Sequence, residues 1–378
     1  MSGAGAVGFR PPKPVFAVPA AFALLLGLWA GLSRIGWDIS SDAQWDARHG
    51  PLMISGFLGT LITMERAVGS GWRWAYIGPA LAGAGAMALV FVDSLDPAKL
   101  LFTGASVSLI ALFGLLLYRY RQLPIVILLT GAVLWLAGNL FWLDGDGLTR
   151  VTPWWVAFLV VTILGERLEL TAYTTRRRRT RVLFLVALAP LLAGLVLTRE
   201  DLQAGQQLAG VGMITLALWL FRFDIARRSI RRPEPARYIA ASLLAGYAWL
   251  AASGLIWLLG PELESGFVYD ATLHAVLLGF VISMVFGHAL IILPGTLRLH
   301  IEFHRRFYAH LLLLHVSVAL RLHADFGTDF DLRRWAGLLN ATAILIFLAS
   351  TFAAARPRRT AAPAVPALAD EPEAASGA

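Results

Sequence analysis

Two of the eight histidines occupy matching positions near the start of apolar segments. His49 lies about two helical turns beyond Ser41, and His274 lies a little over two turns beyond Ser265, if these serines cap helices. Ionisable side chains are costly inside a bilayer, so histidines within a membrane span are candidates for function. Both helices would run in the same direction, which places the two imidazoles at a similar depth in the outer third of the membrane.

Two neutral imidazoles that face each other across a helical bundle supply the two axial nitrogens of a haem iron. Small residues follow both histidines and would leave room for the macrocycle. They are Gly50, Ser55, Gly56 and Gly59 after His49, and Ala275 and Gly279 after His274. We therefore predict one haem b with His49 and His274 as its ligands. The alternative is a pair of interfacial histidines that hydrogen-bond to water.

The sequence contains no cysteine, which limits the kinds of metal site that it can build. Disulfides, thiolate ligands, iron–sulfur clusters and covalent haem attachment through Cys-x-x-Cys-His are all excluded. Any haem must therefore be held noncovalently by histidine or methionine.

Three further histidines are predicted to gather deeper in the bundle. His288 follows His274 by fourteen residues, which places it on nearly the same helix face and roughly 21 Å deeper. The next helix enters from that side, so His310 lies near the depth of His288, with His315 about 7 Å further in. A second haem or a copper site built from His288, His310 and His315 is our second metal prediction. Interfacial histidines that snorkel beside arginines are its alternative.

The elements that must position these residues are membrane-spanning helices. Apolar residues make up 58% of the chain, charged residues 15%, and the mean hydropathy is +0.67. Apolar runs recur that are long enough to cross a bilayer as helices, and they are apolar on every side, unlike the strands of a membrane barrel. The twelve predicted spans are 14–35, 45–66, 74–93, 98–118, 123–143, 151–171, 181–198, 205–222, 237–259, 266–293, 306–323 and 334–355.

The basic residues predict the orientation of these spans. Most of the 32 Lys and Arg residues, including the run Arg176 to Arg179, fall on one side, and acidic residues dominate the other. Cytoplasmic loops accumulate basic residues, so we predict that both termini are cytoplasmic, in a multi-pass protein of a bacterial-type inner membrane. The net charge of +8 then reflects topology and contact with the lipid bilayer, and no nucleic-acid partner is expected.

We expect a single transmembrane domain over residues 14–356, with disordered tails at 1–13 and 357–378 that are rich in Gly, Ala and Pro. Near the inner end of the sixth span, Glu166, Arg167 and Glu169 precede the arginine run. We predict that they anchor the helix at the interface, and a charged trio that guides protons is the alternative.

The residues around both candidate ligands resemble those of a known family. The stretch Arg48-His49-Gly50-Pro51-Leu52-Met53 resembles the low-spin haem helix of haem-copper oxidase subunit I. Leu273-His274-Ala275-Val276-Leu277, followed by Phe280, Phe286 and Pro294, resembles the helix that carries the opposite ligand of that haem. The twelve spans and cytoplasmic termini also match this superfamily and its smaller NnrS relatives, which are haem- and copper-containing membrane proteins linked to nitric oxide. The resemblance implies an all-α bundle like that of oxidase subunit I.

The chain also departs from the oxidase pattern. Thr272 stands where oxidases carry the ligand of the active-site haem, and the segments 151–171 and 181–198 contain no histidine that could bind copper. Oxygen reduction is therefore not expected. A bis-histidine iron has no free position, so it passes electrons and does not bind a gas unless one ligand leaves.

The expected function is nitric oxide tolerance or respiratory electron transfer, with a quinol or a cytochrome as electron donor or a diatomic gas as partner. Two alternatives from other classes stay open. The first is a cofactor-free twelve-helix transporter or permease. The second is a divergent quinol-linked reductase with a second metal site.

Overall fold

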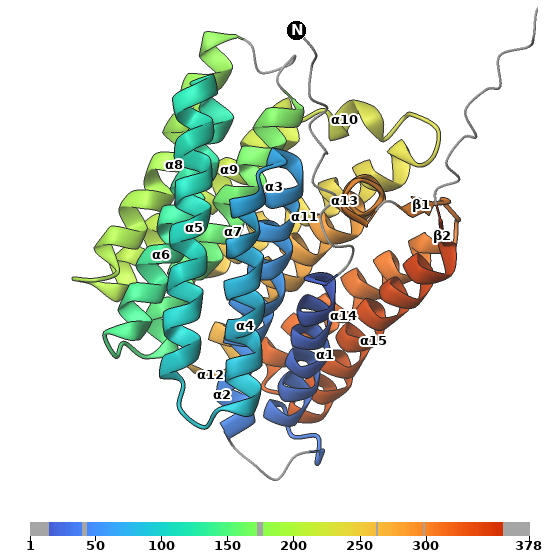
Figure 1. The fold of residues 1–378 in the computed structure, drawn as a ribbon. Coiled ribbons are helices and arrows are strands. Elements are labelled where there is room, and N and C mark those ends of the chain that lie inside the picture. Colours follow the sequence, from blue (N-terminus) through green and yellow to red (C-terminus); the bar gives the residue numbers. More distant parts are fainter. Residues whose placement is uncertain (1–14, 40–43, 172–176, 262–263, 298, 358–378) are drawn as a thin grey trace, which may run out of the picture.

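The structure is a computed structural model that describes residues 15–39, 44–171, 177–261, 264–297 and 299–357. The tails predicted over 1–13 and 357–378 lie almost entirely outside the described residues. Within the described part, long helices stand side by side and run alternately up and down the bundle (Figure 1).

Twelve helices in the described residues are long and apolar enough to span a bilayer, and each overlaps one predicted span. The elements are α1 (Ala17–Arg34), α2 (Gln44–Pro51), η1 (Leu52–Gly59), α3 (Thr60–Ser70), η2 (Arg73–Tyr76), α4 (Ile77–Phe91), α5 (Asp96–Tyr120), α6 (Leu123–Leu143), α7 (Leu148–Leu170), α8 (Arg178–Leu197), α9 (Leu202–Phe223), α10 (Ala226–Ser229), α11 (Ala236–Leu259), α12 (Gly266–His274), η3 (Ala275–Ile282), α13 (Ser283–Leu297), β1 (Leu299–Ile301), α14 (Phe307–Gly327), α15 (Phe330–Ala354) and β2 (Ala355–Pro357). The prediction of an all-α, multi-pass membrane protein with about twelve spans is confirmed.

The helix ends follow local sequence signals. Pro97 and Pro124 lie in the first turn of α5 and α6, where the missing N–H of proline has no partner within the helix in any case. Asp201 caps α9 by accepting a hydrogen bond from Ala204 N at 2.9 Å. α3 ends at Gly71, whose φ of 70° is the left-handed conformation that glycine adopts without strain.

The outer surface of the bundle is apolar. Large apolar side chains are exposed on the outward faces of several spans, for example Val186 on α8, Leu218 on α9, Leu312 on α14 and Phe352 on α15. A soluble protein rarely leaves so many large apolar groups in water. Lipid is therefore the solvent of this surface.

Glycines allow some of the helices to pack at very short range. A Cβ atom on Gly212 of α9 would lie 2.3 Å from the backbone nitrogen of Leu191 on α8, and one on Gly194 of α8 would lie 2.3 Å from that of Ala209 on α9. Without a hydrophobic driving force in lipid, such close backbone approach is a main source of helix association.

Both histidine-bearing spans change their winding just after the histidine. α2 passes into the π-helix η1 at Leu52, and α12 passes into the π-helix η3 at Ala275, directly after His274. Pro51 accounts for the first switch, because it lacks the N–H that the regular ladder needs. The second switch has no proline. Such π segments are rare and occur frequently at functional sites.

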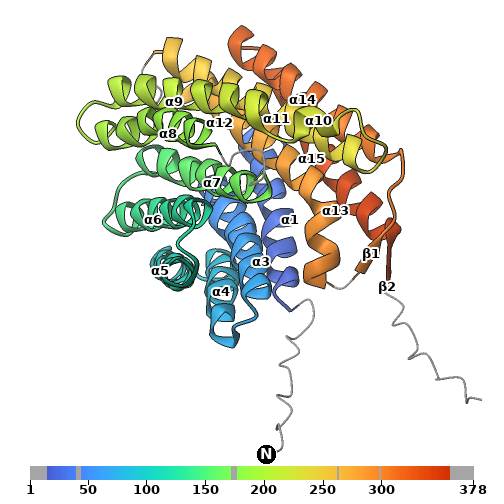
Figure 2. The same cartoon turned by 90° about the horizontal axis from the view of Figure 1, so that it is seen from above.

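Three further spans, α1, α14 and α15, border the space between these two. α1 packs on η1 and on α15, while α14 packs on α12, η3 and α15; Figure 2 shows these helices from above. β1 pairs antiparallel with β2 at one end of the bundle. We call that end the strand end, and we call the opposite end, which carries α2 and α12, the histidine end.

Candidate functional site

The structure brings the two predicted ligands together. The ring centroids of His49 and His274 are 6.5 Å apart, and the ring planes deviate from parallel by 12°. The two residues come from different spans, separated by more than two hundred residues of sequence. The predicted similar depth of the two imidazoles is thus what the fold produces.

Each imidazole is fixed by a backbone carbonyl. His49 Nδ1 is 2.7 Å from Gly27 O on α1, and His274 Nδ1 is 2.7 Å from Asp270 O one turn earlier on α12. A carbonyl oxygen only accepts hydrogen bonds, so Nδ1 carries the proton in both rings. Nε2 therefore keeps its lone pair in each ring. This second hydrogen bond is the one that metal-binding histidines commonly make, because it fixes the ring and raises its basicity.

A glycine on α1 makes the position of His49 possible. A Cβ atom on Gly31 would lie 2.7 Å from His49 Cε1 and 2.8 Å from Nδ1. Any larger residue would push the ring away from the carbonyl of Gly27. The sequence Gly27-x-x-x-Gly31 therefore presents a carbonyl and an open surface to the same imidazole, one turn apart.

A cavity of about 80 Å³ adjoins the histidine pair. We call it the histidine cavity. Most of its lining is apolar and comes from α1, η1, η3 and α15, and the polar exceptions lie toward the histidine end. The polar residues that line it are Arg34, Asp270, Arg321 and Asn340, besides the two histidines.

A buried ionic cluster lies beside His274. Asp270 accepts hydrogen bonds from Arg321 Nη2 at 2.6 Å and Nε at 3.1 Å, and Arg333 Nη2 lies 3.0 Å from the same carboxylate. Arg333 Nε is also 2.9 Å from Asp325. Two carboxylates and two guanidinium groups thus neutralise one another. The carboxylate of Asp270 is 3.4 Å from His274 Nδ1, which couples the cluster to the imidazole.

The three deeper histidines do not converge in this way. His288 accepts from Arg167 Nη1 at 3.2 Å, and its Nδ1 is 2.8 Å from Met284 O. Both nitrogens of His315 are also engaged, by Trp249 Nε1 at 2.9 Å and by Ser283 Oγ at 3.3 Å.

His310 is 2.9 Å from the hydroxyl of Tyr238 through Nε2, while its Nδ1 is buried without a partner. Within the described ranges, no group of three or more His, Asp or Glu side chains is placed to hold a metal ion. The second haem or copper site predicted for His288, His310 and His315 gains no geometric support.

The charged trio on α7 is not a simple interface anchor. Arg167 is only 3% exposed and donates two hydrogen bonds to the Asp224 carboxylate, at 2.8 and 2.7 Å. Glu166 accepts a 2.6 Å hydrogen bond from Arg66 on α3, whereas Glu169 is largely exposed. For Arg167 the prediction of an interface anchor is wrong, because the sequence did not show that Asp224 would lie opposite it.

Comparison with known proteins gives a family but no activity. The model of a family described as a domain of unknown function (DUF8744) matches residues 13–356. The chain belongs to this family. No curated protein and no solved structure matches the chain. The function of this DUF8744 chain is therefore inferred from the chemistry of its own residues.

Several residues of this site in the DUF8744 chain were not predicted from the sequence. Asp270, Arg321 and Asp325 all lie within predicted spans or at their edges, so the rule that singled out the histidines applied to them equally. Asp270 also stands four residues before His274, on the same helix face. Gly31 gave no signal of its own, since the chain contains 35 glycines.

Proposed function

We propose that this protein is a membrane haem protein that carries electrons through one haem b held between His49 and His274. The observation that carries the proposal is the geometry of the pair: nearly parallel rings with centroids 6.5 Å apart. An imidazole nitrogen binds a metal at roughly 2 Å, so two imidazoles on opposite sides of one iron have centroids about 6 Å apart. The observed spacing agrees with that arrangement.

The protonation of the rings supports the same reading. Both Nδ1 atoms face carbonyl oxygens at 2.7 Å, so both Nε2 atoms keep the lone pair that a metal ligand needs. Two histidines that merely sat at a wet interface would not need carbonyl partners from two different helices.

The surroundings of the pair also suit a porphyrin. The flat apolar macrocycle would contact the apolar lining of the histidine cavity, and Arg34 and Arg321 are the cations that would face its two carboxylates. The cavity of about 80 Å³ is smaller than a whole porphyrin. Flexible lining side chains such as Met53 must therefore turn aside when haem binds.

The chain would hold the haem and adjust its redox potential. If bound, a haem would be held by His49 and His274 and would supply a one-electron carrier. The two carbonyls would fix the imidazoles that hold it, and the Asp270 carboxylate would bring negative charge within 3.4 Å of His274 Nδ1. Respiratory electron transfer, in a bacterial-type inner membrane with cytoplasmic termini, is the process we propose. The resemblance to NnrS links the same carrier to nitric oxide tolerance.

The test is the absorption spectrum of the purified full chain, oxidised and reduced. We expect a Soret band in the parent that is lost in His49→Ala and in His274→Ala. His323→Ala is the matched control, because His323 lies toward the same end of the bundle but is exposed. A colourless parent that stays folded and is stabilised by a solute would overturn the haem proposal in favour of the transporter alternative.

A further inference from the structure

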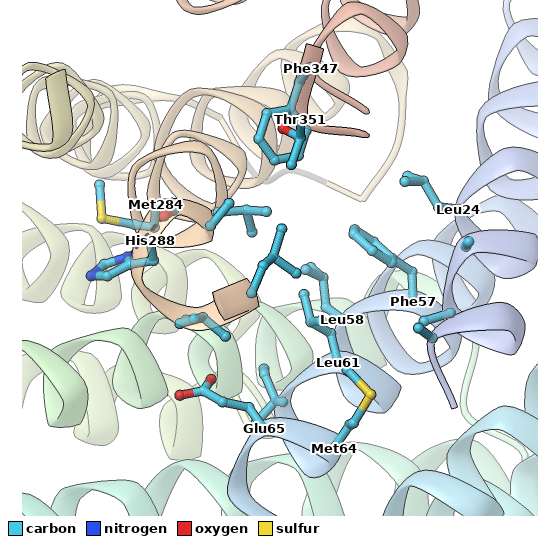
Figure 3. Close-up of a pocket in the computed structure, with 18 of the residues that line it drawn as sticks. Leu24, Phe57, Leu58, Leu61, Met64, Glu65, Met284, His288, Phe347 and Thr351 are labelled. Carbon is cyan, nitrogen blue, oxygen red and sulfur yellow. Dashed lines mark hydrogen bonds between the residues drawn. The ribbon is translucent and has the colours of Figure 1, made fainter. Parts of the chain in front are cut away.

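A second and larger cavity lies deeper in the bundle, closer to the strand end. It has a volume of about 180 Å³ and is lined from α1, η1, α3, α7, η3, α13 and α15. Figure 3 shows its apolar walls, with Leu24 and Phe57 on one side and Phe347 on another. We call it the deep cavity. Its size and lining suit the body of a membrane-soluble molecule.

The polar groups of the deep cavity are few and include two carboxylates. Glu166 is already engaged by Arg66, and the nitrogens of His288 are engaged by Arg167 and Met284. Glu65 differs. The nearest cation to its carboxylate is Arg66 at 3.8 Å, and the described residues give it no hydrogen-bond donor. Glu65 therefore keeps acceptor capacity for a hydroxyl group at the edge of an otherwise apolar space.

The deep cavity meets the histidine cavity. Leu58 lines both. On the spans that carry the histidines, Ile54 and Ile282 line the histidine cavity, and their neighbours Phe57 and Val281 line the deep one. Leu58 thus separates the near end of the deep cavity from the histidine cavity, whereas Glu65 follows His49 by sixteen residues, about 24 Å along the span.

Charge decides which membrane-soluble molecule fits. A phospholipid phosphate would face the carboxylates of Glu65 and Glu166, and like charges repel. A hydrocarbon chain alone would leave the carboxylate of Glu65 without a partner, at a cost. A neutral ring that bears hydroxyl groups and an apolar tail satisfies both conditions.

We propose that the deep cavity binds an isoprenoid quinol, with a ring hydroxyl donating to the Glu65 carboxylate. The binding itself stands without the haem, and its meaning as an electron source rests on the proposed function. A carboxyl oxygen of Glu65 accepts the hydrogen bond that the ring hydroxyl donates.

The test measures binding to the full chain in nanodiscs freed of native quinone. Decylubiquinol is added under dithionite without oxygen, so that the haem is already reduced and only binding is measured. Retained probe is compared with that on empty nanodiscs. We expect saturable excess binding in the parent.

Two variants and their controls test the site. Glu65→Gln should weaken quinol binding about tenfold, because the charge-assisted hydrogen bond is lost. Glu169→Gln should not, since Glu169 also pairs with Arg66 but does not line the cavity. Ala289→Leu fills part of the cavity and should also reduce binding. Ala193→Leu, on the exposed face of α8, should leave it unchanged.

The proposal fails if the folded parent retains no more quinol than empty nanodiscs, or if Glu65→Gln and Ala289→Leu bind as the parent does. A phospholipid found in stoichiometric amount and not released by the probe would identify a different occupant and overturn it. A missing Soret band would overturn the haem proposal alone, because the binding measurement does not use the haem.

Discussion

Arg321 donates a 2.6 Å hydrogen bond to the carboxylate of Asp270. The backbone carbonyl of the same Asp270 holds His274 Nδ1 at 2.7 Å. One residue therefore ties a proposed haem ligand to a buried pair of guanidinium groups. The carboxylate brings negative charge within 3.4 Å of the imidazole, and such partners tune the potential of a bound metal.

Replacement of the Asp270 carboxylate should change the redox potential of the proposed haem. Asp270→Asn keeps the carbonyl and the shape of the side chain but removes a negative charge near the proposed haem, so its ferric state would lose stabilisation. We expect a higher midpoint potential in a spectroscopic redox titration. Asp331→Asn is the control, because Asp331 also pairs with an arginine but is 88% exposed. An unchanged potential in Asp270→Asn would mean that the carboxylate does not act on the iron.

The glycine beside His49 gives a second prediction. In Gly31→Ala the new Cβ would lie 2.7 Å from the imidazole, so the ring must leave its carbonyl partner. We expect a strongly reduced Soret band and a lower melting temperature. Gly114→Ala on α5 should bind haem normally, because a Cβ there meets no atom within 4 Å, and it should gain helix propensity. Equal haem content in the two variants would argue against a positioned His49.

Much of the architecture could be predicted because lipid restricts it. The twelve spans followed from the lengths of apolar runs, since any segment that crosses a bilayer must satisfy its backbone internally. The pairing of His49 with His274 could be predicted as well, because each stands near the start of a span that runs in the same direction. The direction of a span and the depth of a residue within it depend on one segment at a time, so both can be predicted from the sequence.

Contacts between spans could not be predicted from the sequence. Asp224 opposite Arg167, and Arg333 opposite Asp270, depend on how helices rotate and tilt against one another, and no single segment records that. The switch to a π-helix after His274 has no proline to signal it. The same limit applies to His288, His310 and His315, whose imidazoles contact different partners.

The buried ion pair of Arg167 and Asp224 gives a stability prediction. Arg167→Gln would leave a fully buried carboxylate without its cation, which costs about 3–5 kcal/mol. Thermal unfolding in detergent should show a clear drop in the melting temperature. The double variant Arg167→Met with Asp224→Asn should recover part of the loss, because no uncompensated charge remains.

A partly exposed ion pair provides the control for the measurement of melting temperature. Arg199 pairs with Asp146, and their side chains are 34% and 25% exposed. Such pairs contribute about 0–1 kcal/mol, so Arg199→Gln should unfold close to the parent. If Arg167→Gln were equally mild, the buried pair would not stabilise this fold.

Metal content gives the last prediction. Both nitrogens of His288 and of His315 are engaged by neighbouring side chains or carbonyls, and His310 is held by Tyr238. His288 and His315 therefore have no nitrogen left to replace a ligand of the proposed haem. His310 has an unpartnered Nδ1, but it does not line the histidine cavity. Single alanine variants at these positions should keep one iron per chain and the parent Soret band, as measured by plasma mass spectrometry and absorption. Copper that co-purifies with the parent and disappears in His310→Ala would contradict this expectation and restore the second metal site.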